Sequence, residues 1–105
     1  MDVFFDDRKF GETCANDRQL KRRYGEKQAK RIALRLQQLR VADNVADLRQ
    51  VTGRVHALTG DLAGLIALDL DGPYRLLVEP LVDGDGPVEW DKVTEVVVLE
   101  VRNYH

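Results

Sequence analysis

The spacing of apolar residues changes at Gly53, and this change constrains the fold more than any other feature of the sequence. Before Gly53, apolar residues recur every three or four positions, the spacing that places them on one side of a helix. After it, short apolar runs alternate with turn residues, as they do in the strands of a sheet. The chain is therefore predicted to be an α+β protein, with N-terminal helices packed on an antiparallel sheet of three or four strands.

The helical part is predicted to divide at Gly25. A helix over residues 17–24 has Asn16 or Asp17 as its cap, because a short polar side chain accepts hydrogen bonds from free amides. Gly25 is the residue type that commonly ends a helix, and a second helix over residues 26–42 follows. Shorter helical turns are expected over residues 8–13 and 45–48. The buried face of the second helix is predicted to carry Ala29, Ile32, Ala33, Leu36 and Leu39, with Lys27, Lys30, Arg31 and Arg35 off that face.

The extended part contains one hairpin that the turn chemistry indicates directly. Residues 65–70 and 74–78 are apolar runs joined by Asp71-Gly72-Pro73, where glycine accepts positive φ and proline stops the strand. Residues 54–58 alternate, with Arg54, His56 and Leu58 on one face. A closing strand is expected over residues 95–104, a loop over residues 80–91, and either a short strand or a hydrophobic anchor over residues 3–5.

Length and composition set limits on the class of protein. A chain of 105 residues with 44% hydrophobic content is predicted to form one domain over residues 1–105. The single Cys14 cannot form an intramolecular disulfide, which suits a reducing compartment. The N-terminus lacks the features of a signal peptide, and the longest apolar run, residues 96–99, is too short to cross a bilayer. A cytoplasmic protein without membrane contact is expected.

No cofactor or metal is expected. The chain has only two histidines and one cysteine, which is too few for a typical zinc site. Residues 69–72 and 83–86 superficially resemble calcium loops, but each is followed by a proline where an oxygen ligand is needed. Both segments are therefore predicted to be turns.

Charge is divided unevenly along the chain. Residues 1–59 carry 13 Lys+Arg against 8 Asp+Glu, whereas residues 60–105 carry 3 against 10, which together give the net charge of −2. Eight of the 18 residues from Arg18 to Arg35 are cationic. This segment is either a solvated helix face or a surface for a polyanion, which would gain affinity from counterion release. The two helices around Gly25 also resemble a helix-turn-helix, but a DNA-reading role is the less favoured interpretation of this segment.

Several polar residues interrupt the predicted strands. Arg75 and Glu79 share a face of one strand, either as a structural salt bridge or as a cation for phosphate beside a carboxylate. His56 is either a half-buried histidine bonded to a carbonyl or part of a site. His105 ends the sequence after another predicted strand.

The order of these residues resembles the pattern of HigB-type killer toxins in the RelE/ParE superfamily. The resemblance covers nearly the whole chain and rests on three motifs in order. They are Arg54-x-His56-x-Leu58-x-Gly60-Asp61-x-x-Gly64, Pro73-Tyr74-Arg75-Leu76-x-x-Glu79-Pro80, and the closing Asn103-Tyr104-His105.

The resemblance implies a RelE-like fold and a toxin that cleaves mRNA in the ribosomal A site without a metal. In such cleavage a base activates the ribose 2′-OH, an arginine stabilises the phosphate and an acid protonates the leaving 5′-oxygen. Its partners would be the ribosome, mRNA and a HigA-like helix-turn-helix antitoxin, with operator DNA contacted only through the antitoxin. The implied catalytic residues are His56, Arg75, Glu79, Asn103, Tyr104 and His105, and the implied RNA- or ribosome-binding residues are Arg22, Arg23, Lys27, Lys30, Arg31 and Arg54.

Two positions depart from the family pattern. Thr59 stands where the family has a lysine, and Asn103 stands where it has an aspartate. Both changes remove charged groups that RNA cleavage would use. A rival hypothesis is therefore a binding protein of the same fold with weakened chemistry, acting through an antitoxin complex or on another target such as DNA gyrase.

Overall fold

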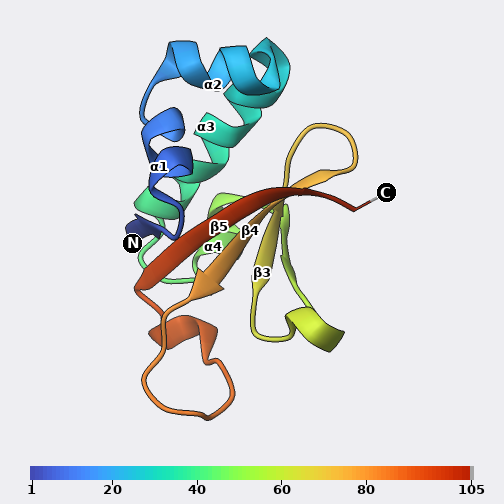
Figure 1. Cartoon of the computed structure of the whole chain (residues 1–105). Coiled ribbons are helices and arrows are strands. Elements are labelled where there is room, and N and C mark those ends of the chain that lie inside the picture. The colour runs from blue at the N-terminus through green and yellow to red at the C-terminus, as the bar shows by residue number, and fades with distance from the viewer. Residues whose placement is uncertain (105) are drawn as a thin grey trace.

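The computed structural model describes residues 1–104, in which one strand is followed by helices and then by the other strands of the same sheet (Figure 1). The elements in chain order are β1 (Asp2–Phe5), α1 (Arg8–Cys14), α2 (Asp17–Tyr24), α3 (Glu26–Val41), α4 (Leu48–Val51), β2 (Val55–Ala57), η1 (Gly60–Leu62), β3 (Ile66–Asp69), β4 (Tyr74–Pro80), η2 (Trp90–Lys92) and β5 (Glu95–Asn103). The α+β class predicted from the sequence is confirmed.

The sheet differs from the predicted one. Over residues 1–104 it has five strands in the order β1-β5-β4-β3-β2, and it is mixed rather than antiparallel. The N-terminal segment is the strand β1, which pairs in parallel with β5 from Asp2 opposite Glu95 to Phe5 opposite Val98. The other three pairings are antiparallel. A parallel pair requires a crossover, and here α1–α3 and the rest of the sheet lie between the two strands in sequence.

The helix boundaries follow from local capping chemistry. Asn16 accepts a hydrogen bond from the backbone of Gln19 at 3.0 Å and so begins α2, as predicted. Gly25 has a φ of 82° and separates α2 from α3. The predicted helical turn over residues 45–48 is displaced, because residues 45–47 form a turn and α4 begins at Leu48.

One face of the sheet packs on the helices and holds the core. Ile32, Leu36 and Leu39 of α3 are buried against alternate residues of β3, β4 and β5. The sheet residues of this core include Leu68, Leu76, Val78, Val96 and Val98, so the residues between them in the strands point to the opposite face. That opposite face carries the polar residues that interrupt the strands.

Two residues of α3 do not lie where the helical spacing predicted. Ala33 is exposed, whereas Arg35 is only 5% exposed. The Arg35 guanidinium donates to the backbone carbonyl of Asp69 at 2.6 Å, so the side chain reaches across to the end of β3. Arg35 therefore does not belong to the exposed cationic surface.

Cys14 ends α1 and packs against the core. Burial raises the pKa of the Cys14 thiol to about 11, and the nearby Arg23 and Arg40 offset only part of that effect. Because the thiolate is the reactive form, we expect iodoacetamide at pH 8 to modify Cys14 at least about 10-fold more slowly than an unstructured cysteine peptide. In urea the rate should rise to that of the peptide. Equal rates in the native and urea-unfolded chain would contradict this expectation.

Candidate functional site

The sheet face away from the helices gathers polar residues from four strands. The register pairs Asp69 of β3 with Arg75 of β4, and Arg75 with Arg102 of β5. His56 of β2 lies opposite Ala67, which is two residues before Asp69 and on the same face of β3. Local alternation fixes which face each residue occupies, and strand pairing brings them together.

Asp69 lies at the centre of this group. One carboxylate oxygen, Oδ2, is 2.9 Å from His56 Nε2. The other, Oδ1, is 3.2 Å from Arg75 Nε. The three side chains are partly buried, with Asp69 26% exposed and His56 40% exposed. A single carboxylate therefore bridges an imidazole and a guanidinium.

Tyr104 lies over the other side of Arg75. Its ring centroid is 5.0 Å from the Arg75 Cζ atom, within the range of a cation–π contact. The backbone amide of Tyr104 donates to the carbonyl of Pro73 at 2.9 Å, which joins the end of the chain to the β3–β4 turn. A hollow of about 450 Å³ lies here, and its lining includes Arg54, Asp69, Gly72, Arg75 and Tyr104. We call it the sheet-face hollow.

Helix α3 supports the β3–β4 hairpin from behind. Besides bonding the Asp69 carbonyl, Arg35 donates to Gln38 at 2.9 Å and to Thr52 at 3.3 Å. Burial lowers the pKa of Arg35. The positive charges of Arg31 and Arg54 lower it further, whereas the carboxylate of Asp69 opposes the change. The Gln28 side chain forms a pair of hydrogen bonds with the backbone of Asp71, of 2.8 and 3.3 Å. These bonds fix the hairpin turn beside the sheet-face hollow.

The chemistry of the sheet-face hollow suits an anion with an adjacent proton-transfer group. Arg54 and Arg75 supply two guanidiniums, whose planar donors match phosphate oxygens. Asp69 balances one of these charges, and His56 adds an imidazole, which can donate or accept a proton. A tyrosine ring beside the cations also offers a stacking surface for a base.

The other predicted catalytic residues, Glu79, Asn103 and His105, are not seen in this group. Glu79 is on the same strand as Arg75, but four residues at 3.3 Å each place it about 13 Å away, and it pairs with Val97 past a β-bulge. Asn103 pairs with Tyr74, so alternation places its side chain on the other face of β5 from Arg102. His105 lies outside the described residues.

The predicted RNA-binding residues of α2 and α3 lie largely exposed, with several local contacts. Arg23 stacks over the Tyr24 ring at 5.2 Å, Lys27 pairs with Asp71 at 3.4 Å, and Lys30 pairs with Glu26 at 3.6 Å. The Lys27 contact places the start of α3 beside the β3–β4 turn, close to the sheet-face hollow. We call the residues Arg22, Arg23, Lys27, Lys30 and Arg31 the cationic helix face.

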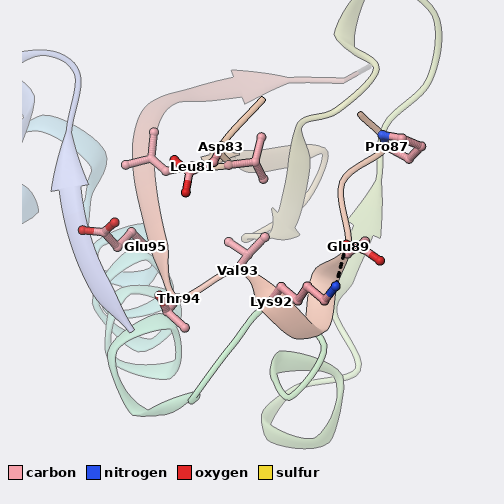
Figure 2. Close-up of a pocket in the computed structure, with 9 residues that line it drawn as sticks. Leu81, Asp83, Pro87, Glu89, Lys92, Val93, Thr94 and Glu95 are labelled. Atoms are coloured by element: carbon pink, nitrogen blue, oxygen red, sulfur yellow. Dashed lines mark ion pairs between the residues drawn. The ribbon is translucent and has the colours of Figure 1, made fainter. Parts of the chain in front are cut away.

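A second hollow, of about 530 Å³, lies beneath the loop of residues 81–94. Figure 2 shows its lining, in which Lys92 forms an ion pair with Glu89 at 3.1 Å. Asp83 and Glu95 add two more carboxylates, so the lining carries an excess of negative charge. This charge opposes RNA binding. The loop lies at the opposite end of the molecule from α2 (Figure 1).

Asp69 is the site residue that sequence reasoning missed. In the sequence, Asp69 falls within the predicted strand of residues 65–70 and within the segment 69–72 that superficially resembles a calcium loop, and neither pattern gives it a role in a site. Structurally it is the last residue of β3. The predicted turn at Asp71-Gly72-Pro73 contained the signal needed to find it, since a hairpin closed there pairs Asp69 with Arg75.

Comparison with known proteins finds no matching family model, no matching curated protein and no matching solved structure. Within residues 1–104, no helix is both long and apolar enough to cross a membrane. The same residues contain no group of three or more His, Cys, Asp or Glu side chains placed to hold a metal ion.

Proposed function

We propose that this chain is a HigB-type toxin with a RelE-like fold, an endoribonuclease that cleaves mRNA on the ribosome and so inhibits translation. The observation that carries the proposal is the meeting of three separate sequence motifs at one site. Arg54 and His56 come from the first motif, Arg75 from the second and Tyr104 from the third. Arg54, Arg75 and Tyr104 line the sheet-face hollow. His56 joins them through its hydrogen bond to Asp69, which also lines the hollow.

In the proposed reaction, His56 accepts the proton of a ribose 2′-OH. The 2′-oxygen attacks the adjacent phosphorus, and the bond from phosphorus to the 5′-oxygen breaks. Arg75 stabilises the charge that builds up on the phosphate oxygens. The products are a 2′,3′-cyclic phosphate and a 5′-hydroxyl, and the proton on that hydroxyl comes from a general acid. The resemblance places His105 among the catalytic residues as a general acid or base, and in this reaction we propose it as the acid.

The cationic helix face is proposed to contact ribosomal RNA. It supplies five of the cations in the basic half of the sequence, and the Lys27–Asp71 pair places it beside the β3–β4 turn. Backbone phosphates bound along α3 would therefore lie near the sheet-face hollow. A HigA-like antitoxin is proposed to block the toxin, with operator DNA bound through the antitoxin alone.

A binding protein with weakened chemistry is the second candidate. The observation that favours it is the Asp69 carboxylate, which already engages both His56 and Arg75. A target other than RNA, such as DNA gyrase, would then account for any toxicity. Growth arrest without mRNA cleavage is the result expected from this candidate.

Cell-free translation separates the two candidates. Purified chain added to ribosomes translating a defined mRNA should produce new 5′ ends within the ribosomal A site, whereas naked mRNA should remain intact, because positioning by the ribosome supplies much of the rate. The Arg22→Glu/Arg31→Glu variant should bind ribosomes about 10-fold or more weakly at low salt, with a flatter salt dependence. Lys92→Glu, at the acidic end, is the control and should match the wild type. Efficient cleavage of naked mRNA, or no cleavage on ribosomes, would contradict the proposal.

A further inference from the structure

We propose that Asp69 is a positioning residue that determines which nitrogen of His56 accepts the proton. The proposal rests on the proposed function for its catalytic consequence, but its structural part stands on the contacts of Asp69 alone. The distance from Asp69 Oδ2 to His56 Nε2 is 2.9 Å, which is a hydrogen bond.

The direction of that hydrogen bond follows from the chemistry of the two groups. An ionised carboxylate has no proton to donate, so Nε2 must be the donor. A neutral imidazole carries one proton, and with that proton on Nε2 the lone pair is on Nδ1. His56 is therefore held as the Nε2–H tautomer, and Nδ1 is the atom that takes the proton from the 2′-OH.

The other oxygen of Asp69 positions Arg75. Oδ1 lies 3.2 Å from Arg75 Nε, so the two side chains form an ion pair. The guanidinium carries five N–H groups, more than one carboxylate oxygen can engage, so donors remain for a phosphate. Tyr104, with its ring 5.0 Å from Cζ, restricts the guanidinium from the other side. One carboxylate thereby sets the orientation of the proposed base and of the phosphate-binding group.

Asp69 is itself held firmly. Its backbone carbonyl accepts from the buried Arg35 at 2.6 Å, and its strand pairs with both β2 and β4. A residue fixed on both sides holds its partners in a narrow range of geometries. When Nδ1 takes the proton from the 2′-OH, His56 becomes an imidazolium and the adjacent carboxylate stabilises it. Asp69 remains ionised throughout, as the acid does in a Ser-His-Asp triad.

The Asp69→Asn variant tests this assignment directly. The amide oxygen of asparagine can still accept from Arg75 Nε, but its NH₂ group donates toward His56 Nε2. The imidazole proton should therefore move to Nδ1, which removes the lone pair that accepts the 2′-OH proton. On translating ribosomes, kcat should fall about 10²- to 10⁴-fold while KM changes by less than about threefold, because the cations that bind phosphate remain.

Nitrogen NMR on the free protein with ¹⁵N-labelled histidine reads the tautomer without any RNA. Above the titration range of the imidazole, wild-type His56 should show a protonated Nε2 and an unprotonated Nδ1, and Asp69→Asn should show the reverse. A His105→Gln background leaves His56 as the only source of the signal. Glu100→Gln is the matched control, since Glu100 is a carboxylate on the same sheet face that pairs with Arg102 at 2.8 Å, and it should alter neither readout.

The outcomes separate this inference from the proposed function. A His56 protonated on Nδ1 beside an unchanged Asp69 would overturn the positioning role, and this measurement does not depend on the folding of Asp69→Asn. An Asp69→Asn chain with wild-type kcat would also overturn it. A wild-type chain with the Nε2–H tautomer but no cleavage on ribosomes would refute the nuclease and leave the positioning role supported.

Discussion

If the chain has the proposed nuclease activity, replacing Arg75 with alanine is expected to reduce ribosome-dependent mRNA cleavage by about 10²- to 10³-fold, the loss seen when a preorganised donor to a developing oxyanion is removed. Arg75 is held by Asp69 at 3.2 Å on one side and by the Tyr104 ring on the other. In the proposed reaction, these two contacts preorganise the guanidinium for a phosphate. The rate of appearance of new mRNA 5′ ends in cell-free translation measures the effect.

Arg75→Lys should fail almost as badly as Arg75→Ala. A lysine presents one ammonium group, which cannot bond Asp69 and also present a planar fork of donors to a phosphate. Arg102→Lys is the control, because Arg102 lies opposite Arg75 in the register but bonds Glu100 on its own strand. Melting curves of all three variants should show that they remain folded. Near wild-type cleavage by Arg75→Lys would contradict a bidentate role for Arg75.

The elements whose limits are set by residues close to them in the sequence could be predicted from the sequence. The limits of α2 match the prediction because Asn16 and Gly25 are local signals for the start and end of a helix. The β3–β4 hairpin was predicted because Asp71-Gly72-Pro73 stops one strand and starts the next. In both cases the deciding chemistry lies within a few residues.

Pairings between distant residues could not be predicted in this way. β1 was an open choice between a strand and an anchor because its partner β5 lies about ninety residues further along the chain. Arg35 was assigned to the exposed face of a helix because the helical spacing cannot show that a strand end lies within reach of its guanidinium. A long arginine side chain can cross an apolar layer and bond a carbonyl beyond it.

The candidate site shows the same division. His56, Arg75 and Tyr104 were each found in a separate motif, but only the strand register brings them together around Asp69. Arg75 and Glu79 were predicted to face the same way, and alternation does place them on one face of β4. They are four residues apart, however, and a rise of about 3.3 Å per residue places Glu79 about 13 Å from Arg75 and away from the group around Asp69.

The buried guanidinium of Arg35 makes the fold of the site depend on one residue of α3. It is 5% exposed and donates to a carbonyl of β3 and to the Gln38 and Thr52 side chains. Within residues 1–104, no buried side-chain nitrogen or oxygen lacks a hydrogen-bond partner. Removing Arg35 would take away the side-chain donor to the Asp69 carbonyl, and it would also open a cavity between α3 and the hairpin.

Arg35→Ala is therefore expected to lower the free energy of unfolding by about 3 kcal/mol or more, which combines lost hydrogen bonds at buried acceptors with a cavity. For a domain of this size that loss lowers Tm by about 12 to 24 °C. Thermal unfolding followed by circular dichroism measures it. Arg35→Lys should lose less, because an ammonium group can still reach one of the acceptors.

Arg22→Ala supplies the matched control for the loss of an arginine from the helices. Arg22 is exposed on α2, so its removal should change the free energy of unfolding by no more than about 0.5 kcal/mol. The two variants lose the same charge and the same atoms, and they differ in burial and hydrogen bonding. If Arg35→Ala melts within a few degrees of Arg22→Ala, the guanidinium of Arg35 does not hold the end of β3, and another contact must fix the position of Asp69.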